Sequence, residues 1–204
     1  MTRRRFLPFI CITMSQFQDE ILIRAMQVED LDQVQEVDRR SFIAPWPASA
    51  YRYELYENPN SSLWVAEVHD PEGHPRVVGV IVLWLIVGEA HIASLAVDPD
   101  YRARGIGGRL LVAALQEAVQ QGMETATLEV RANNQVAQNL YRRFHFQVAG
   151  RRTRYYRDNN EDALIMTIEG LGRSYAQWLS SGAWNSRAAK SGDKGPEGNG
   201  KPEG

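Results

Sequence analysis

The stretch VDPDYRARGIGGRLL (residues 97–111) places two arginines and three glycines within seven residues. A segment with strand character precedes it, and a segment with the apolar spacing of a helix follows. The first N–H groups of a helix have no partner inside the helix, and the helix dipole adds partial positive charge. Glycines let an anion approach that backbone closely. The stretch therefore predicts an anion-binding loop that suits a pyrophosphate; the alternative is an ordinary tight turn.

Two common phosphate-binding loops do not fit these residues. A Walker A loop would continue after its glycines with Lys and then Ser or Thr, and these are missing here. A dinucleotide-binding fingerprint that begins at Gly105 would need a third glycine at position 110, which is Leu110. The anion site is therefore of another kind.

The composition indicates one ordinary globular domain. The chain has 204 residues, is 44% hydrophobic and carries a formal charge of −2, which gives no bulk argument for nucleic acid or an anionic membrane. The longest apolar run, residues 77–87, is too short to span a bilayer. The single cysteine, Cys11, excludes an internal disulfide framework and a cysteine metal cluster. We expect cytoplasmic surroundings, with neither nucleic acid nor membrane as a direct partner.

Both ends of the chain differ from the middle. Residues 1–19 contain three arginines and a short apolar stretch interrupted by Pro8. We interpret this segment as disordered or as an over-long start, with Met14 as a second start, and export is the alternative. Residues 186–204 combine glycine, proline and alternating charge, which predicts a flexible tail.

The domain itself is expected over residues 20–170. Residues 171–185 carry four large apolar side chains on one helical face and are predicted to dock on it. Periodicity predicts helices at about 28–42, 48–57, from the glycine loop to Gly122, and 133–144. It predicts strands at 21–25, 62–68, 76–87, 91–97, 125–131, 146–155 and 163–169. The second and third strands are expected to pair antiparallel, and the class is α+β around one mixed sheet.

The spacing Arg102-Ala-Arg-Gly105-Ile-Gly107 resembles the Arg/Gln-x-x-Gly-x-Gly/Ala motif of the GCN5-related N-acetyltransferases (GNAT). LEVRANN (128–134) and NLYRRFHF (139–146) follow at the distances expected for the RimI-type branch. The resemblance covers about residues 20–170. It implies a single domain with a mostly antiparallel mixed sheet and a V-shaped splay.

The resemblance also implies a ligand and a reaction. In this family the loop holds the pyrophosphate of acetyl-coenzyme A, and the branch acetylates the N-terminal amine of an alanine-starting ribosomal protein. The matching loop residues here are Arg102, Ala103, Arg104, Gly105, Ile106, Gly107 and Gly108.

Glu129 is the candidate general base. On the strand at 125–131, Thr127, Glu129 and Arg131 share one face, opposite three apolar residues. An ion pair with Arg131 or another arginine is the alternative role. The resemblance places Glu129 at the general-base position of the RimI-type enzymes, where a carboxylate would accept the proton of the attacking amine.

Tyr141 and Asn134 belong to the helix that follows. Tyr141 lies on its apolar stripe, so a core tyrosine is one reading; the resemblance implies that it protonates the leaving thiolate. Asn134 matches a coenzyme-contacting asparagine and equally suits a helix cap.

The strand segment Leu95, Ala96 and Val97 is implied to offer backbone groups to the acetyl and pantetheine parts of the coenzyme. The family carries a β-bulge there, and one freed N–H polarises the thioester carbonyl. His91 lies on the same strand, and we interpret it as structural.

Acceptor selection is predicted from aromatic residues elsewhere. The segment IAPWP (43–47) resembles the Phe-Pro-Trp segment of the branch, although Ala44 replaces the phenylalanine. Trp46, Tyr155 and Tyr156 would wall a narrow slot for a chain terminus; aromatic packing is the alternative for each.

The sequence thus predicts an N-terminal acetyltransferase that uses acetyl-coenzyme A by direct attack on a protein N-terminus. The four histidines show no ligand spacing, so no metal is implied. Two alternatives stay open: an acetyltransferase for a small amine or a lysine side chain, and a coenzyme-binding module without catalysis. The oligomeric state is left open.

Overall fold

The computed structural model describes residues 21–70 and 72–185. The predicted extension 1–19 with Cys11 and the predicted tail 186–204 lie outside the described residues. Among the described residues, no helix has both the length and the apolar character needed to cross a membrane. Seven strands within the described ranges form a single sheet: β1 (Leu22–Ala25), β2 (Ser61–His69), β3 (Pro75–Ile86), β4 (Glu89–Val97), β5 (Thr125–Arg131), β6 (Gln147–Tyr156) and β7 (Glu161–Glu169).

The helices lie between these strands and after them. The α-helices are α1 (Leu31–Ser41), α2 (Ala48–Tyr56), α3 (Ile106–Gln120), α4 (Gln135–Arg143) and α5 (Arg173–Ser180). The short 3-10 helices are η1 (Val28–Asp30), η2 (Pro99–Tyr101) and η3 (Ala183–Asn185). The helix predicted over 28–42 thus starts with a 3-10 turn. Arg24 pairs with the buried Asp30 at 2.6 Å, and Asp30 accepts the backbone N–H of Gln27 at 2.7 Å, which closes that turn.

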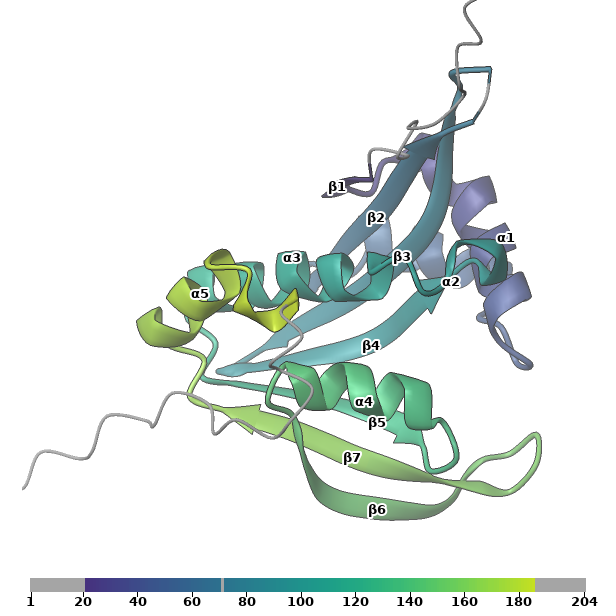
Figure 1. Cartoon of the computed structure of the whole chain (residues 1–204). Helices are drawn as coiled ribbons and strands as arrows, with labels where there is room; N and C mark the ends of the chain where they lie inside the picture. Colours follow the sequence, from purple (N-terminus) through teal and green to yellow (C-terminus); the bar gives the residue numbers. More distant parts are fainter. Residues whose placement is uncertain (1–20, 71, 186–204) are drawn as a thin grey trace, which may run out of the picture.

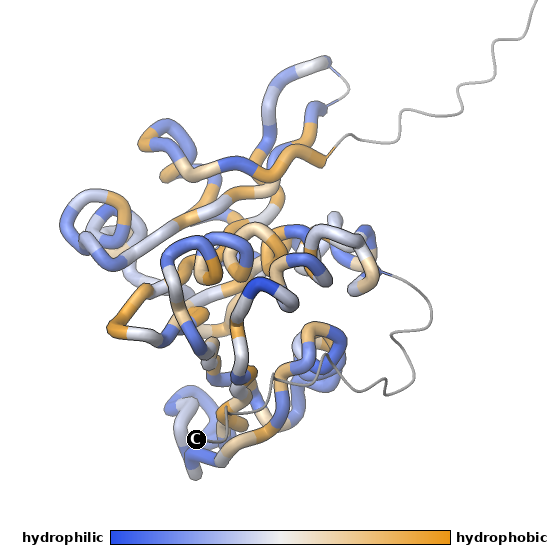
Figure 2. The backbone as a smooth tube through the Cα atoms, turned by 90° about the vertical axis from the view of Figure 1, so that its left-hand side faces the viewer, coloured by the Kyte–Doolittle hydropathy of each residue, from blue (hydrophilic) through white to orange (hydrophobic). Residues whose placement is uncertain are grey.

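The strand order β1-β2-β3-β4-β5-β7-β6 confirms a mixed, mostly antiparallel sheet. The expected antiparallel pairing of β2 with β3 is confirmed, and the β4–β5 pair is the parallel one. Helices α3, α4 and α5 lie in front of the sheet in Figure 1, and α1 and α2 lie behind it. Hydrophobic stretches gather towards the centre of the molecule, between these layers (Figure 2).

Strands β4 and β5 pair only over their first halves, Glu89–Ile92 with Thr125–Leu128. Beyond that point they diverge, as Figure 1 shows, which opens the sheet into the expected V. Among the described residues, the splay leaves one edge of β4, from Ala93 to Val97, without a neighbouring strand. Backbone groups on that edge can therefore bond to something other than protein.

A β-bulge in β4 lies next to the splay. Val82 pairs with Ser94 and Leu83 pairs with Ile92, so Ala93 is an extra residue with no partner in this register. The side-chain alternation changes there. Ala90 and Ile92 face the α3 side before the bulge, and Leu95 and Val97 face it afterwards. The bulge that the resemblance implied is present, slightly upstream of Leu95.

The first turn of α3 packs closely on the sheet because β3 has a glycine there. Gly79 pairs with Val97, and a Cβ at Gly79 would lie 3.0 Å from Leu110 and 3.1 Å from Ile106. The glycine loop is thereby held at the carboxyl end of β4, beside the splay.

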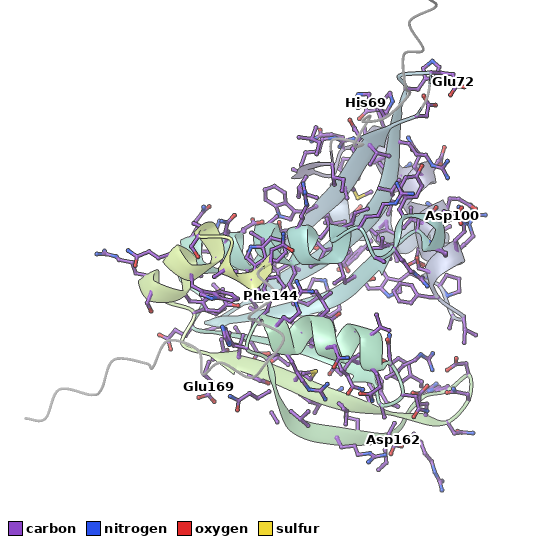
Figure 3. All side chains as sticks on the ribbon, viewed as in Figure 1. His69, Glu72, Asp100, Phe144, Asp162 and Glu169 are labelled. Atoms are coloured by element: carbon purple, nitrogen blue, oxygen red, sulfur yellow. The ribbon has the colours of Figure 1, made fainter. Side chains whose placement is uncertain are left out.

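The C-terminal segment packs on α3 and on the end of α4. Tyr175 and Leu179 of α5 are buried, and the hydroxyl of Tyr175 donates to the carbonyl of Phe144 at 2.9 Å. Phe144, labelled in Figure 3, lies between α4 and α5. Its ring stacks on Trp184 of η3 with 5.5 Å between centroids. The segment therefore supports the two helices that flank the splay.

Candidate active site

The glycine loop has the backbone conformation of an anion cradle. Ala103 and Gly105 both adopt the left-handed region, with φ of 62° and 79°. Gly105 caps α3, and the hydrogen bond from the N–H of Arg109 to the carbonyl of Gly105 closes the first turn at 3.1 Å. The N–H groups of residues 106–108 precede that bond and have no acceptor inside the helix. Backbone amides arranged in this way bind anions.

The two loop arginines are oriented by the surrounding backbone. Arg102 donates its Nε–H to the carbonyl of Val97 at 3.1 Å, which uses one of its five N–H donors. Arg104 donates to the carbonyl of Asp100 at 3.3 Å, and its guanidinium lies 4.8 Å from the ring centroid of Tyr101. Both arginines are exposed and lie beside the amides of the loop.

Gly107 and Gly108 face different neighbours. A Cβ at Gly107 would lie 3.3 Å from the flexible end of Leu140, whereas a Cβ at Gly108 would lie 2.7 Å from the indole of Trp184. Trp184 has little room to move, because Phe144 stacks on it and Arg143 donates to its carbonyl at 3.0 Å. The structure thus explains the glycine at 108 by packing.

Gly108→Ala is expected to lower the free energy of unfolding by about 1–2 kcal/mol, because overpacking at Trp184 outweighs the gain in helix propensity. Gly107→Ala is the matched control and should change stability by less than about 0.5 kcal/mol, since Leu140 can adjust. Urea unfolding of both variants measures the difference. If Gly108→Ala no longer lowers stability when it is made in a Trp184→Ala background, the indole is the cause of the loss. A Gly108→Ala variant as stable as the parent would contradict the packing explanation.

The segment Leu95, Ala96 and Val97 pairs with β3 on one edge and faces the splay on the other. The carbonyl of Val97 already accepts Arg102 and the hydroxyl of Ser41, the latter at 3.2 Å. Leu95 and Val97 point their side chains to the α3 side and Ala96 to the α1 side. The edge beside the splay is available for the backbone contacts that the resemblance implies, which stay a prediction, whereas the Val97 carbonyl already accepts two hydrogen bonds.

Glu129 opens onto a cavity of about 320 Å³ on the face of the sheet opposite α3 and α4. Its strand neighbours Leu128 and Val130 point into the core on the α3 side, so Glu129 points the other way. Only 11% of its side chain is exposed. The cavity is lined by Trp84, Ile86, Glu89, His91, Glu129, Arg152 and Tyr155.

Each carboxylate oxygen of Glu129 faces one basic side chain. Oε1 lies 3.2 Å from Nη2 of Arg152, and Oε2 lies 3.3 Å from Nε2 of His91. Arg131 instead pairs with Asp158 at 2.8 Å and with Glu161 at 3.1 Å. Glu129 therefore does pair with an arginine, and that arginine comes from β6.

His91 and Arg152 are the site residues that sequence reasoning missed. His91 alternates with Ala90 and Ile92 and pairs with Thr127 across the parallel β4–β5 register, which brings it next to Glu129. That alternation indicated that His91 lies on the polar face of its strand. Its position next to Glu129 follows only once the pairing of β4 with β5 is known. No signal in the sequence placed Arg152 there. Among the described residues, no group of three or more His, Cys, Asp or Glu side chains is arranged to hold a metal ion.

Tyr141 lies on the other face of the sheet, in the core beneath α4. Burial raises the pKa of its hydroxyl above the usual range, with a smaller contribution from Tyr156. No hydrogen bond of this hydroxyl is found within residues 21–70 and 72–185, whereas the buried Tyr51 and Tyr175 donate to Asp38 and to Phe144. Tyr141 therefore differs from a core tyrosine with a satisfied hydroxyl.

Tyr156 lies next to Tyr155 and has a raised pKa. Burial raises its pKa to about 12, opposed by the guanidinium of Arg131 and assisted by the charges of Tyr155, Glu129 and Glu161. The Arg131 guanidinium lies 3.9 Å from its ring centroid. Tyr156 thus packs against Arg131 and Tyr155, at the edge of the sheet that carries β6.

The remaining predicted residues lie in three places. The side chain of Asn134 accepts the N–H of Ala137 at 3.1 Å and caps α4. Tyr155 lines the Glu129 cavity, with Tyr156 perpendicular to it at 5.2 Å. Trp46 is not among the lining residues; its ring packs on Tyr51 at 5.2 Å.

A buried acid holds the loop that carries Trp46. The backbone N–H of Trp46 and the hydroxyl of Tyr51 donate to the two oxygens of Asp38, each at 2.7 Å. Burial raises the pKa of Asp38, although both hydrogen bonds act in the opposite direction.

Several known proteins are similar to this chain in sequence. A family model described as "Acetyltransferase (GNAT) family" matches residues 31–146. A Bacillus subtilis protein, provisionally named a [ribosomal protein bS18]-alanine N-acetyltransferase, is 37% identical over 146 residues, which cover 72% of this chain and 93% of the relative.

Two solved structures share the fold. The ribosomal-protein-S18-alanine N-acetyltransferase of Escherichia coli superposes with a TM-score of 0.64 at 27% identity, covering 73% of this chain and 93% of that chain. A Bacillus anthracis protein, provisionally named a streptothricin acetyltransferase and solved with acetyl coenzyme A, gives 0.58 at 26% identity, covering 73% of this chain and 99% of that one.

Proposed function

This chain belongs to the GNAT family and is an N-acetyltransferase, and we propose that it moves the acetyl group of acetyl-coenzyme A to the N-terminal amine of a protein. The favoured acceptor is an alanine-starting ribosomal protein of the bS18 kind, because that activity is named for the Bacillus subtilis and Escherichia coli relatives. The observation that carries the proposal is the carboxylate of Glu129, which is largely shielded from solvent and opens onto a cavity beside the splay of β4 and β5.

The residues around the splay fit the coenzyme. The amides of residues 106–108, with Arg102 and Arg104, would hold the pyrophosphate, and the free edge of β4 would bond to the pantetheine arm. When bound, acetyl-coenzyme A supplies an acetyl group activated as a thioester. The bulge at Ala93 would turn a backbone N–H towards the thioester carbonyl and stabilise negative charge there.

The proton transfers need one acceptor and one donor. Glu129 accepts the proton that the amine nitrogen loses as the new N–C bond forms. Tyr141 donates its hydroxyl proton to the sulfur as the C–S bond breaks, and burial keeps that hydroxyl protonated by raising its pKa. The two groups lie on opposite faces of the sheet, so the proposed base would face the acceptor and the proposed acid would lie on the side of α3 and α4.

An N-terminal amine suits a carboxylate base better than a lysine does. At pH 7 roughly a tenth of an α-amine with a pKa near 8 is neutral, compared with less than about a thousandth of a lysine side chain. A modest base such as Glu129, with no metal, can therefore activate an N-terminal amine.

One mass-spectrometric assay tests the proposal. The purified chain with acetyl-coenzyme A would be offered peptides that begin with Ala, Ser or Met, a lysine peptide with a blocked terminus, and polyamines. We expect acetylation at the α-amine, fastest for the Ala peptide. Acetylation confined to lysine or polyamine would assign the acceptor to the alternative class, and coenzyme binding without any transfer would identify a non-catalytic module.

A further inference from the structure

We propose that Arg152 occupies the position beside Glu129 at which the ammonium group of the acceptor binds. When the acceptor binds, Arg152 moves away from this position. This inference rests on the proposed function, because it takes Glu129 as the base that meets the acceptor amine. It makes Arg152 a residue that controls entry of the acceptor's charged end, and it locates that end at one particular carboxylate oxygen.

The carboxylate of Glu129 has both oxygens engaged. Arg152 lies 3.2 Å from Oε1 and His91 lies 3.3 Å from Oε2. With 11% of the side chain exposed, an acceptor reaches these oxygens through the cavity that both partners line. An ammonium group that approaches Glu129 therefore competes with one of these two partners for a carboxylate oxygen.

His91 is the partner that is held in place. It lies on a central strand, and its ring stacks on Trp84 with 5.5 Å between centroids and 21° between planes. The indole N–H of Trp84 donates to Glu54 at 2.8 Å, and Glu54 is buried. Movement of His91 would disturb this whole chain of contacts.

Arg152 is the partner that can leave. It lies on β6, the edge strand, and 52% of its side chain is exposed. The β6–β7 register breaks directly after it, and Arg154 adopts a left-handed conformation with φ of 52°. The guanidinium also lies over the ring of Tyr155 at 5.4 Å, a side chain that is itself exposed. Because Arg152 is half exposed and returns to water when it leaves, this ion pair is easier to exchange than one between two buried groups.

The charge around Glu129 favours exchange of one cation for another. Besides His91 and Arg152, the ionisable groups around it are Glu89 and Tyr155, which line the cavity, and Tyr156, whose ring packs against Tyr155. A guanidinium and an ammonium both carry one positive charge and donate N–H groups to a carboxylate oxygen. Replacing Arg152 by an N-terminal ammonium leaves the local charge unchanged and brings the nitrogen to the base.

The exchange has a consequence that a simple acceptor contact would not have. If Arg152 competes with the ammonium for Oε1, removing its charge strengthens binding of the acceptor. If Arg152 instead binds the acceptor directly, removing it weakens binding. The two roles therefore predict opposite signs.

The test uses calorimetric binding of two peptides to the full chain with coenzyme A at pH 7. One peptide begins with alanine, and the other is identical except that hydrogen replaces the amine. We expect Arg152→Gln to bind the free-amine peptide about three- to tenfold more tightly than the parent chain, with unchanged affinity for the amine-free peptide. Arg152→Lys keeps the charge and should resemble the parent.

The matched control is Arg151→Gln. Arg151 is the neighbouring residue, is similarly exposed and pairs with Asp162 at 2.7 Å, outside the cavity. It should change neither affinity. Weaker binding of the free-amine peptide by Arg152→Gln, an equal change for both peptides, or failure of parent and variant alike to distinguish the peptides would overturn the inference.

These binding measurements need no turnover, so they are independent of the acetylation assay. If Arg152→Gln binds the free-amine peptide more tightly but the parent chain acetylates no peptide, this inference stands and the proposed reaction is wrong. If the parent chain acetylates the peptide but Arg152→Gln shows no gain in affinity, only this inference is wrong.

Discussion

Glu129→Gln is expected to lower kcat/KM for an alanine-starting peptide by about 10²- to 10⁴-fold, the usual contribution of a positioned general base. Glutamine keeps the size of the side chain and one acceptor oxygen between His91 and Arg152, but it cannot take the proton of the amine. The deficit should narrow at alkaline pH, because more of the acceptor is then already neutral. Steady-state kinetics from pH 6 to 9 would measure both effects.

Glu89→Gln is the matched control, since Glu89 lines the same cavity, whereas the two basic residues of that cavity, His91 and Arg152, pair with Glu129. It removes the same charge from the same wall and should change kcat/KM by less than about threefold. If Glu129→Gln turned over as fast as the parent chain, or if Glu89→Gln were equally impaired, Glu129 would not be the base.

Tyr141→Phe is expected to lower kcat by about 10²-fold while leaving stability nearly unchanged. The hydroxyl makes no hydrogen bond with the described part of the chain, so its removal breaks none there. Its loss would, however, leave the sulfur without a proton donor as the C–S bond breaks. Single-turnover kinetics at saturating peptide and acetyl-coenzyme A, together with urea unfolding, would separate the two properties.

Tyr175→Phe should show the opposite pattern. Its hydroxyl donates to the carbonyl of Phe144 at 2.9 Å, so its removal should cost about 1 kcal/mol of unfolding free energy and leave kcat unchanged. Full activity of Tyr141→Phe would show that Tyr141 is not the general acid and that its role is structural.

Much of the fold could be predicted because it depends on residues close together in the sequence. Alternation and helical spacing located the strands and most of the helices, and the glycine loop was placed correctly at the start of α3. The main difference, the 3-10 turn before α1, comes from the bonds of Asp30 to Arg24 and Gln27. Local periodicity does not report a contact of that kind.

The candidate site, too, could be predicted from the sequence only in part. Strand alternation was sufficient to place Glu129 on the polar face of β5, away from the core. Its two partners arrive from β4 and β6, and only the pairing of the strands brings His91 and Arg152 to its two oxygens. Similarly, the three loop glycines suggested one common role, whereas Trp184 gives Gly108 a separate one.

Short-range patterns of apolar, polar and glycine residues were enough to specify the elements, the loop and the face on which the carboxylate lies, because these follow from backbone geometry over a few residues. The splay of β4 from β5, the bulge at Ala93 and the two partners of Glu129 required the assembled sheet. Each of these features depends on which strand lies beside which and in what register, and that choice is made by packing across the whole core.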